Sequence, residues 1–191
     1  MRKVLVVLNL SNFTGTANHC IKTANGGYEK LRVDYKEMLQ YLVNDRELLG
    51  AYVISQQDVK STRTAEQLTA NQKFVQKLKD FGWTPVRIPY DSSSNDMTAV
   101  FDIIWQNVLS PFADERGELT INPATTDIVF VNGSASWFDL INSFFQLGFQ
   151  AEVAYPKSAI SSLLTANFAF LDLTQFLLQN NAKVKAKQIK E

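Results

Sequence analysis

The chain has 191 residues, of which 46% are hydrophobic and 20% charged, a composition that fits one globular domain with a buried core. Its 19 basic and 19 acidic residues give a formal net charge of zero, which excludes a global attraction to nucleic acid or membranes but leaves room for a local basic patch. A single cysteine, Cys20, excludes an internal disulfide and a thiolate zinc cluster, and it fits the reducing cytoplasm where we expect the protein.

The first residues are basic and then apolar, as at the start of a signal peptide. The apolar run, Val4–Leu8, is shorter than the ~7 residues of a signal-peptide core, so we expect a buried strand instead. No run approaches the ~18 apolar residues of a membrane span, and no membrane contact is expected. Residues 9–29 are polar and contain several glycines, which predicts a long loop.

The rest of the chain alternates between two apolar patterns. Short continuous apolar runs predict strands that are covered on both faces, and apolar residues three or four positions apart predict helices. The expected strands span 48–54, 83–88, 128–131 and 150–154, and the expected helices span 31–43, 65–81, about 97–109, 136–147 and 158–180.

This alternation predicts an α/β fold: a three-layer sandwich of a mostly parallel five-stranded sheet with helices on both faces. Residues 110–126, with two prolines and four charges, are expected to form an exposed excursion. We expect one domain over residues 1–180, followed by a basic C-terminal tail over residues 181–191.

The stretch from Thr126 to Phe138 reads as a buried strand, a turn and a helix, and it holds the main candidate site. In an open parallel sheet, ligands bind at the carboxyl ends of the strands. Backbone N–H groups after Gly133 offer a phosphate site, although a serine in this turn also fits a simple helix N-cap. The candidate residues in the turn are Asn132, Gly133, Ser134 and Ser136.

Other candidates follow the remaining predicted strands. Asn9 and Asn12 either line the same cleft or cap the loop after the first strand. Asp96 is a weak catalytic candidate that also fits a helix N-cap or first-turn acid. Lys60, Arg63 and the tail lysines would contact backbone phosphates, although a frayed, solvated tail explains its lysines equally well. His19 and Cys20 are adjacent and are read as two loop residues rather than a catalytic pair.

The ordered elements from about residue 3 to residue 173 resemble the NYN family of PIN-like nucleases, in particular its LabA-like branch. The family's first strand ends in an Asp-Gly-x-Asn-Leu-like motif, matched here by Asn9-Leu10-Ser11-Asn12-Phe13. Its fourth strand runs into Ser-Gly-Asp-Ser-Asp-Phe, matched by Asn132-Gly133-Ser134-Ala135-Ser136-Trp137. An aspartate pair six residues apart is matched by Asp96 and Asp102. The other motif aspartates fall on Asn9, Ser134 and Ser136.

The resemblance implies a nuclease that cuts RNA or DNA with Mg²⁺ or Mn²⁺ held by carboxylates. Because amide and hydroxyl oxygens are neutral and weaker ligands, we expect no metal site and no cofactor. The sequence therefore predicts a catalytically degenerate domain that binds RNA or single-stranded nucleic acid, or else a protein partner or a second copy. Two alternatives remain open: a residual Mg²⁺- or Mn²⁺-dependent ribonuclease using Asp96 with Asp91 or Asp139, and a structural protein with a vestigial cleft.

Overall fold

A six-stranded sheet forms the centre of the computed structural model, which describes residues 1–24, 26, 32–58, 64–90 and 97–188. The strands lie in the order β3-β2-β1-β4-β5-β6, and each hydrogen-bonded pair of neighbours is parallel. The α/β fold with a parallel sheet is thereby confirmed, with six strands where the sequence predicted five. The strands are β1 (Lys3–Asn9), β2 (Glu47–Asp58), β3 (Thr84–Tyr90), β4 (Thr126–Val131), β5 (Gln150–Tyr155) and β6 (Ala169–Asp172).

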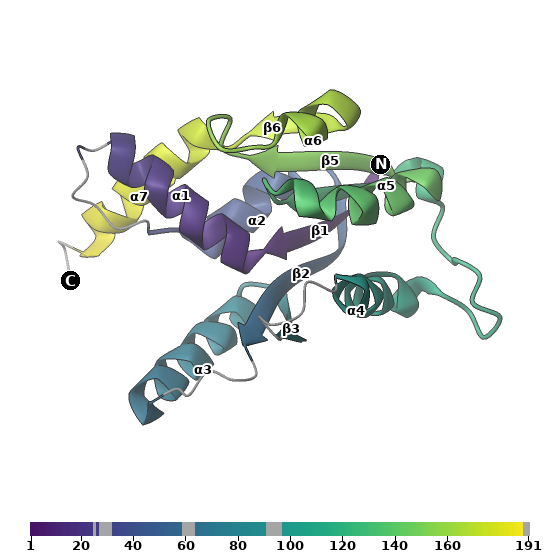
Figure 1. Cartoon of the computed structure of the whole chain (residues 1–191), viewed down its shortest axis with the longest axis horizontal. Helices are drawn as coiled ribbons and strands as arrows, with labels where there is room; N and C mark the ends of the chain where they lie inside the picture. The colour runs from purple at the N-terminus through teal and green to yellow at the C-terminus, as the bar shows by residue number, and fades with distance from the viewer. Residues whose placement is uncertain (25, 27–31, 59–63, 91–96, 189–191) are drawn as a thin grey trace.

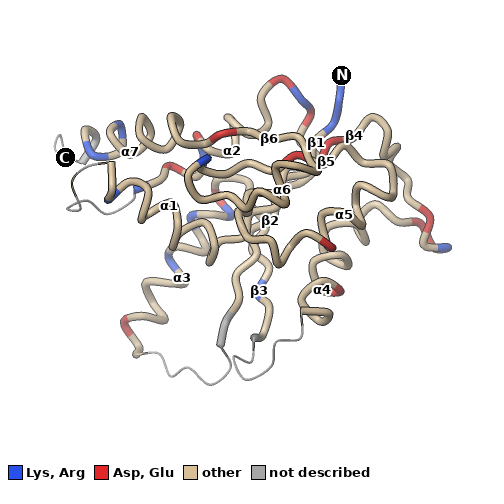
Figure 2. The backbone as a smooth tube through the Cα atoms, turned by 45° about the horizontal axis from the view of Figure 1, so that its top comes forward, with Lys and Arg blue, Asp and Glu red and all other residues tan. Residues whose placement is uncertain are grey.

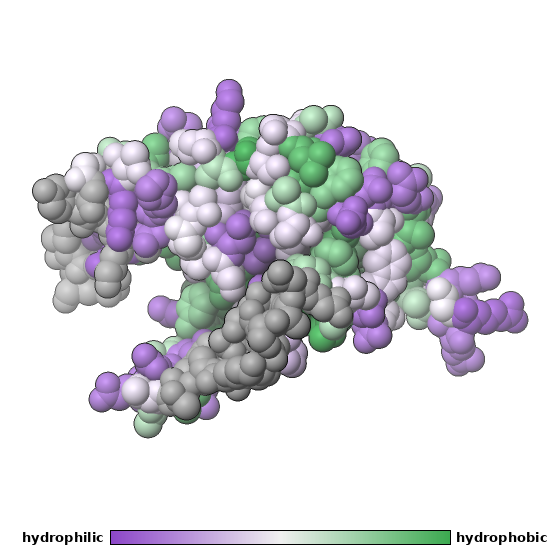
Figure 3. All heavy atoms as spheres, viewed as in Figure 1, coloured by the Kyte–Doolittle hydropathy of each residue, from purple (hydrophilic) through white to green (hydrophobic). Residues whose placement is uncertain are grey.

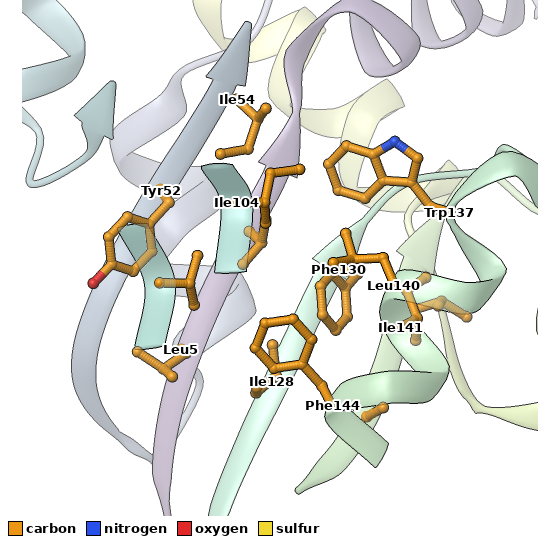
Figure 4. Close-up of a cluster of buried hydrophobic side chains, with 14 of the residues drawn as sticks. Leu5, Tyr52, Ile54, Ile104, Ile128, Phe130, Trp137, Leu140, Ile141 and Phe144 are labelled. Carbon is orange, nitrogen blue, oxygen red and sulfur yellow. The ribbon is translucent and has the colours of Figure 1, made fainter. Parts of the chain in front are cut away.

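Helices cover both faces of this sheet, as predicted (Figure 1). One layer contains α1 (Leu10–Ala24), α2 (Tyr35–Val43), α3 (Ala65–Asp80) and α7 (Thr174–Gln188), and the other contains α4 (Thr98–Leu109), α5 (Phe138–Gln146) and α6 (Ser162–Asn167). The alternation of strand side chains divides the core between them: Val6 of β1 packs toward the first layer and Leu5 toward the second. Figure 4 shows the second cluster, where Ile104, Leu140 and Phe144 surround Phe130.

Helix α1 occupies most of the segment in which a long loop was expected, and that prediction was wrong. Phe13, Ala17 and Ile21 are spaced by four residues and are all buried, so they anchor one face of the helix against the sheet. Gly15 lies on the open side, with nothing within 4 Å of the position its Cβ would take. A narrow apolar stripe therefore outweighed the polar composition that suggested a loop.

The sixth strand corrects the expectation of one helix over residues 158–180. The segment instead forms α6, β6 and the start of α7. Phe168 is buried, and Phe170 and Leu171 are partly buried against the two cores, so this short apolar run favours an edge strand. The Asp172 carboxylate then accepts hydrogen bonds from the backbone N–H of Thr174 at 2.9 Å and of Lys157 at 3.1 Å. Helix α7 continues to Gln188, so the first part of the predicted basic tail is helical.

The strand order places a topological switch point between β1 and β4 at the centre of the sheet. The chain proceeds outward from β1 through β2 to β3, and then returns to pair β4 with the other side of β1. Crossovers run in opposite directions from these two strands, and open α/β sheets generally bind ligands at the carboxyl ends of such strands. No helix within the described ranges is long and apolar enough to cross a membrane.

Candidate functional site

Two asparagines join the carboxyl ends of β1 and β4 at the switch point. The Asn9 Nδ2 group donates to Asn132 Oδ1 at 3.0 Å, and both residues are buried. Asn132 Nδ2 in turn donates to the backbone oxygen of Ser134 at 2.8 Å. Because a carboxamide both donates and accepts, the pair satisfies its own buried polar atoms and fixes the turn after β4.

Asn12 connects the first turn of α1 to the same network. Its Oδ1 accepts from the Gly133 backbone N–H at 2.9 Å, and its own backbone N–H reaches Asn9 Oδ1 at 3.4 Å. The Nδ2 group of this half-buried side chain has no hydrogen-bond partner among the described residues. Asn12 therefore presents a free donor at the carboxyl edge.

Gly133 and Tyr155 form the tightest contact of the site. A Cβ at position 133 would lie 2.2 Å from Tyr155 Cε1, so only glycine leaves room for the ring. The Tyr155 hydroxyl donates to the backbone oxygen of Asn12 at 2.8 Å. Burial raises the pKa of Tyr155 to about 12, so the hydroxyl remains a neutral donor. Sequence reasoning missed Tyr155.

The two serines of the turn bind mainly to each other. Ser134 Oγ lies 2.8 Å from Ser136 Oγ and accepts from the Ser136 backbone N–H at 3.3 Å. Ser134 is therefore the N-cap of a short 3₁₀ helix, Ala135–Trp137, that precedes α5. Two of the N–H groups that were expected to bind phosphate, those of Gly133 and Ser136, already have protein partners. Asn12 Nδ2 and the one hydroxyl hydrogen that the Ser134–Ser136 pair leaves over are the available donors.

The described residues of this edge do not fit a divalent metal ion. The side-chain oxygens of Asn9, Asn12 and Asn132 each accept a hydrogen bond, and none carries a charge. In proteins, Mg²⁺ usually binds through one or two carboxylates together with waters and phosphate oxygens. Across the described ranges, His, Cys, Asp and Glu form no group of three or more that could hold a metal. The predicted candidates Asp91, Asp96, Lys60 and Arg63 lie outside the described residues.

Asp102 and Asp139 do come together, although on the other layer of the molecule. They line one cavity of about 320 Å³ between α4 and α5, together with Trp105 and Ser143. Asp139 begins the first turn of α5, only a few residues after the serines. The structure thus brings two carboxylates near each other without placing them in the asparagine network.

Three segments beside the carboxyl edge contain no acidic residue, whereas α5 carries Asp139 in its first turn. Neither α1, nor residues 156–171, nor α7 contains an aspartate or glutamate. These segments carry exposed Lys22, Lys157 and Lys183. Figure 2 shows basic residues, in blue, along α7. Lys183 pairs with Glu37 of α2 at 3.5 Å. Asp172, between β6 and α7, holds backbone N–H groups, and these bonds outweigh burial and lower its pKa. Lys22 and Lys157 are therefore exposed basic side chains beside this edge, and Lys157 also lies near the Asp172 carboxylate.

A second charged cluster lies at the opposite edge of the sheet and was not predicted. Asp127 accepts from Arg2 Nε at 2.8 Å and from Arg46 Nη1 at 3.1 Å. Burial alone would raise the pKa of Asp127, but the two guanidinium groups outweigh it and hold that pKa below its usual range. A cavity of about 590 Å³ beside the cluster is also lined by Asp45 and Glu152. Burial raises the pKa of Glu152.

Comparison with solved structures supports the fold. The chain is similar to the crystal structure of a protein of unknown function from Vibrio parahaemolyticus RIMD 2210633, with a TM-score of 0.60. The alignment covers 90% of this chain and 93% of that chain at 13% sequence identity, a level at which only the fold is shared. No protein-family model and no curated protein matches the sequence.

Proposed function

We propose that this chain is a catalytically degenerate, NYN-type PIN-like domain that binds single-stranded nucleic acid along the carboxyl edge of its sheet without a metal. The hydrogen bond between Asn9 and Asn132 carries this proposal. It stands at the switch point, where the resembled family would have a carboxylate on the first strand. A neutral amide pair there links β1 to β4, so no cation is needed to hold the two strand ends together.

The remaining polar groups suit a phosphate better than a metal. Asn12 Nδ2 offers N–H donors, and of the hydrogen-bonded Ser134 and Ser136 hydroxyls, the one that accepts from the other can donate a hydrogen bond to an anionic oxygen. Such bonds to a charged acceptor are stronger than neutral ones. Since no carboxylate belongs to this network, nothing in it repels a phosphodiester.

Two exposed lysines on segments beside the network support the same proposal. Lys22 on α1 and Lys157 after β5 are exposed on segments without acidic residues. Lysines that neutralise phosphates release counterions, so affinity should fall as salt rises. A domain with zero net charge can therefore still bind nucleic acid on one face.

The test is fluorescence anisotropy with a labelled single-stranded RNA in the presence of EDTA. Asn12→Asp keeps the oxygen that accepts from Gly133 but replaces the free donor by a negative charge. We expect this change to weaken binding by about tenfold or more, given about 1.5–3 kcal/mol for a hydrogen bond to a charged group. Asn107→Asp, on the exposed face of α4, is the matched control and should leave the affinity unchanged. Equal affinities of the two variants, or no binding by the parent, would refute the proposal.

The alternative, a residual Mg²⁺- or Mn²⁺-dependent ribonuclease, has one observation in its favour. Asp102 and Asp139 share a cavity, so two carboxylates are available to a cation if Asp91 or Asp96 joins them. The alternative predicts cleavage of RNA in Mn²⁺ that is lost in Asp139→Asn and in Asp96→Asn. Cleavage at the parent rate by both variants would end it.

The third possibility, a module that binds a protein partner or a second copy, rests on an apolar surface. Phe145, Leu147 and Leu163 are 47%, 42% and 44% exposed, and Figure 3 shows hydrophobic residues over α5 and α6. Exposed apolar groups that gather in one place mark interaction sites. This possibility predicts a dimer by light scattering that Phe145→Lys dissociates, and a parent protein that is monomeric at all concentrations would contradict the second-copy version.

A further inference from the structure

A cavity of about 360 Å³ lies between α1, α7 and the segment that follows β5. Its walls are mostly apolar, and its rim is polar. This volume is near the lower limit for small-molecule sites, so it suits one small ring system rather than an extended ligand. The wall includes Ile21, Pro156, Leu177 and Leu178, and the rim includes His19, Thr23 and Ser158.

The cavity lies farther along helix α1 from the carboxyl edge of the sheet. Asn12 and His19 are seven residues apart, so they share one face of the helix about 10.5 Å from each other along its axis. On the opposite wall, Pro156 directly follows Tyr155, whose hydroxyl holds the backbone of Asn12. The backbone N–H of Ser161 also donates to the Gly133 oxygen at 2.9 Å. The polar edge and the cavity are therefore parts of one surface.

The rim leaves a few groups available to a ligand. The His19 side chain is exposed and has no hydrogen-bond partner in the described part of the chain. The Thr174 hydroxyl is taken by Asp172 at 2.6 Å, and Thr23 donates to the His19 backbone oxygen at 2.9 Å. Ser158 Oγ has only a weak contact with Cys20 Sγ, at 3.4 Å. An unstacked base can stack on an imidazole ring, pack against apolar side chains and form a hydrogen bond with a nearby hydroxyl.

Charge distinguishes this cavity from the other two described above. The cavity at the amino edge is lined by Asp45, Asp127 and Glu152 together with Arg2 and Arg46, and the one between α4 and α5 by Asp102 and Asp139. No acidic residue is among the described residues that line the cavity beside α1. Lys22 and Lys157 instead lie next to its lining residues in the sequence, on segments free of acids. A ring attached to phosphates therefore meets no carboxylate in the described lining of this cavity, whereas carboxylates line the other two.

We propose that this cavity seats one base of a nucleic-acid strand whose backbone lies on the Asn12 edge. The inference rests on the proposed function and names the part of the strand that the protein holds most firmly. The base stacks against the His19 ring and packs on Leu177, while Lys22 and Lys157 neutralise the flanking phosphates. Stacking is tolerant of sequence, so binding should require a base without strongly selecting its identity.

The experiment compares two labelled probes in EDTA: a short oligouridylate and a ribose-phosphate strand of the same length without bases. Because stacking of one base contributes about fivefold or more in affinity, the parent should bind the oligouridylate at least about fivefold more tightly. His19→Ala, which removes the ring, and Thr23→Trp, which fills the rim, should both reduce the affinity for oligouridylate to that for the abasic strand. Neither variant should change binding of the abasic strand.

Thr14→Trp is the matched control for Thr23→Trp. Both threonines are exposed on α1, and each donates its hydroxyl to the backbone oxygen four residues earlier, at 2.9 Å. Only Thr23 lines the cavity. Thr14→Trp should bind both probes as the parent does, and thermal melts should show that all three variants fold.

The outcomes separate this inference from the function on which it rests. If the parent binds both probes equally and Thr23→Trp has no effect, the edge binds a backbone but the cavity holds no base, and the inference is wrong. If the parent binds neither probe, both proposals are wrong. Loss of discrimination in His19→Ala and Thr23→Trp, but not in Thr14→Trp, supports the inference.

Discussion

Replacing Gly133 by alanine should damage both the stability and the site of this protein. The added Cβ would lie 2.2, 2.4 and 2.9 Å from three atoms of the Tyr155 ring. The ring is completely buried, and its hydroxyl is held by the backbone of Asn12. Neither the ring nor the turn can therefore give way without breaking other contacts.

The expected loss of stability follows from these contacts. Overpacking of a well-filled core costs about 1–3 kcal/mol, and a displaced ring would lose a hydrogen bond of about 1 kcal/mol. The sum, about 2–4 kcal/mol, corresponds to a Tm lower by about 4–16 °C for a domain of this size. Because the same movement displaces Asn12, binding of RNA should weaken as well.

Thermal denaturation followed by circular dichroism measures the effect, and Gly15→Ala serves as the control. Gly15 lies inside α1 with nothing within 4 Å of its missing Cβ, so alanine there should raise stability by about 0.5–1 kcal/mol. A Tm for Gly133→Ala equal to that of the parent would show that the close approach of Tyr155 does not exist.

Two further predictions concern the two edges of the sheet. Asn9→Asp replaces the donor to the buried Asn132 oxygen by an acceptor, so a denaturant titration should show a loss of about 1–3 kcal/mol; an unchanged midpoint would contradict the amide pair. Because the pKa of Asp127 is lowered in the folded state, its ionised carboxylate stabilises the fold at pH values above the pKa that it has in the unfolded chain. This contribution should disappear as the pH falls below about 4. Asp127→Asn should be less stable at neutral pH by about 1.5–3 kcal/mol and should lose less stability on acidification, whereas parallel pH profiles of variant and parent would count against the Arg46 pairing.

The elements predicted from the sequence are those whose signal is local. The continuous apolar run of β4 and the periodic apolar face of α4 are each contained in a few neighbouring residues. The stripe formed by Phe13, Ala17 and Ile21 was equally local, but glycines and polar residues around it favoured a loop. A helix of this kind is held by its packing on the sheet rather than by its intrinsic propensity.

The candidate site was predictable only in part, for a different reason. Asn9 and Asn132 follow predicted parallel strands, so their presence at one edge could be inferred, and the structure places them in hydrogen-bond contact. Nothing near Tyr155 in the sequence reveals that its hydroxyl reaches Asn12, 143 residues away. The same holds for Arg46 and Asp127, which are 81 residues apart. Such contacts depend on the tertiary arrangement and carry no local pattern.

The central claim is that the carboxyl edge binds nucleic acid through neutral donors without a metal. The most direct measurement is the affinity of the parent for labelled single-stranded RNA, determined once in EDTA and once in Mn²⁺, with the length of the RNA checked afterwards. We predict the same affinity in both conditions and an intact strand. Binding that requires Mn²⁺, or shortening of the RNA that EDTA prevents, would contradict the account.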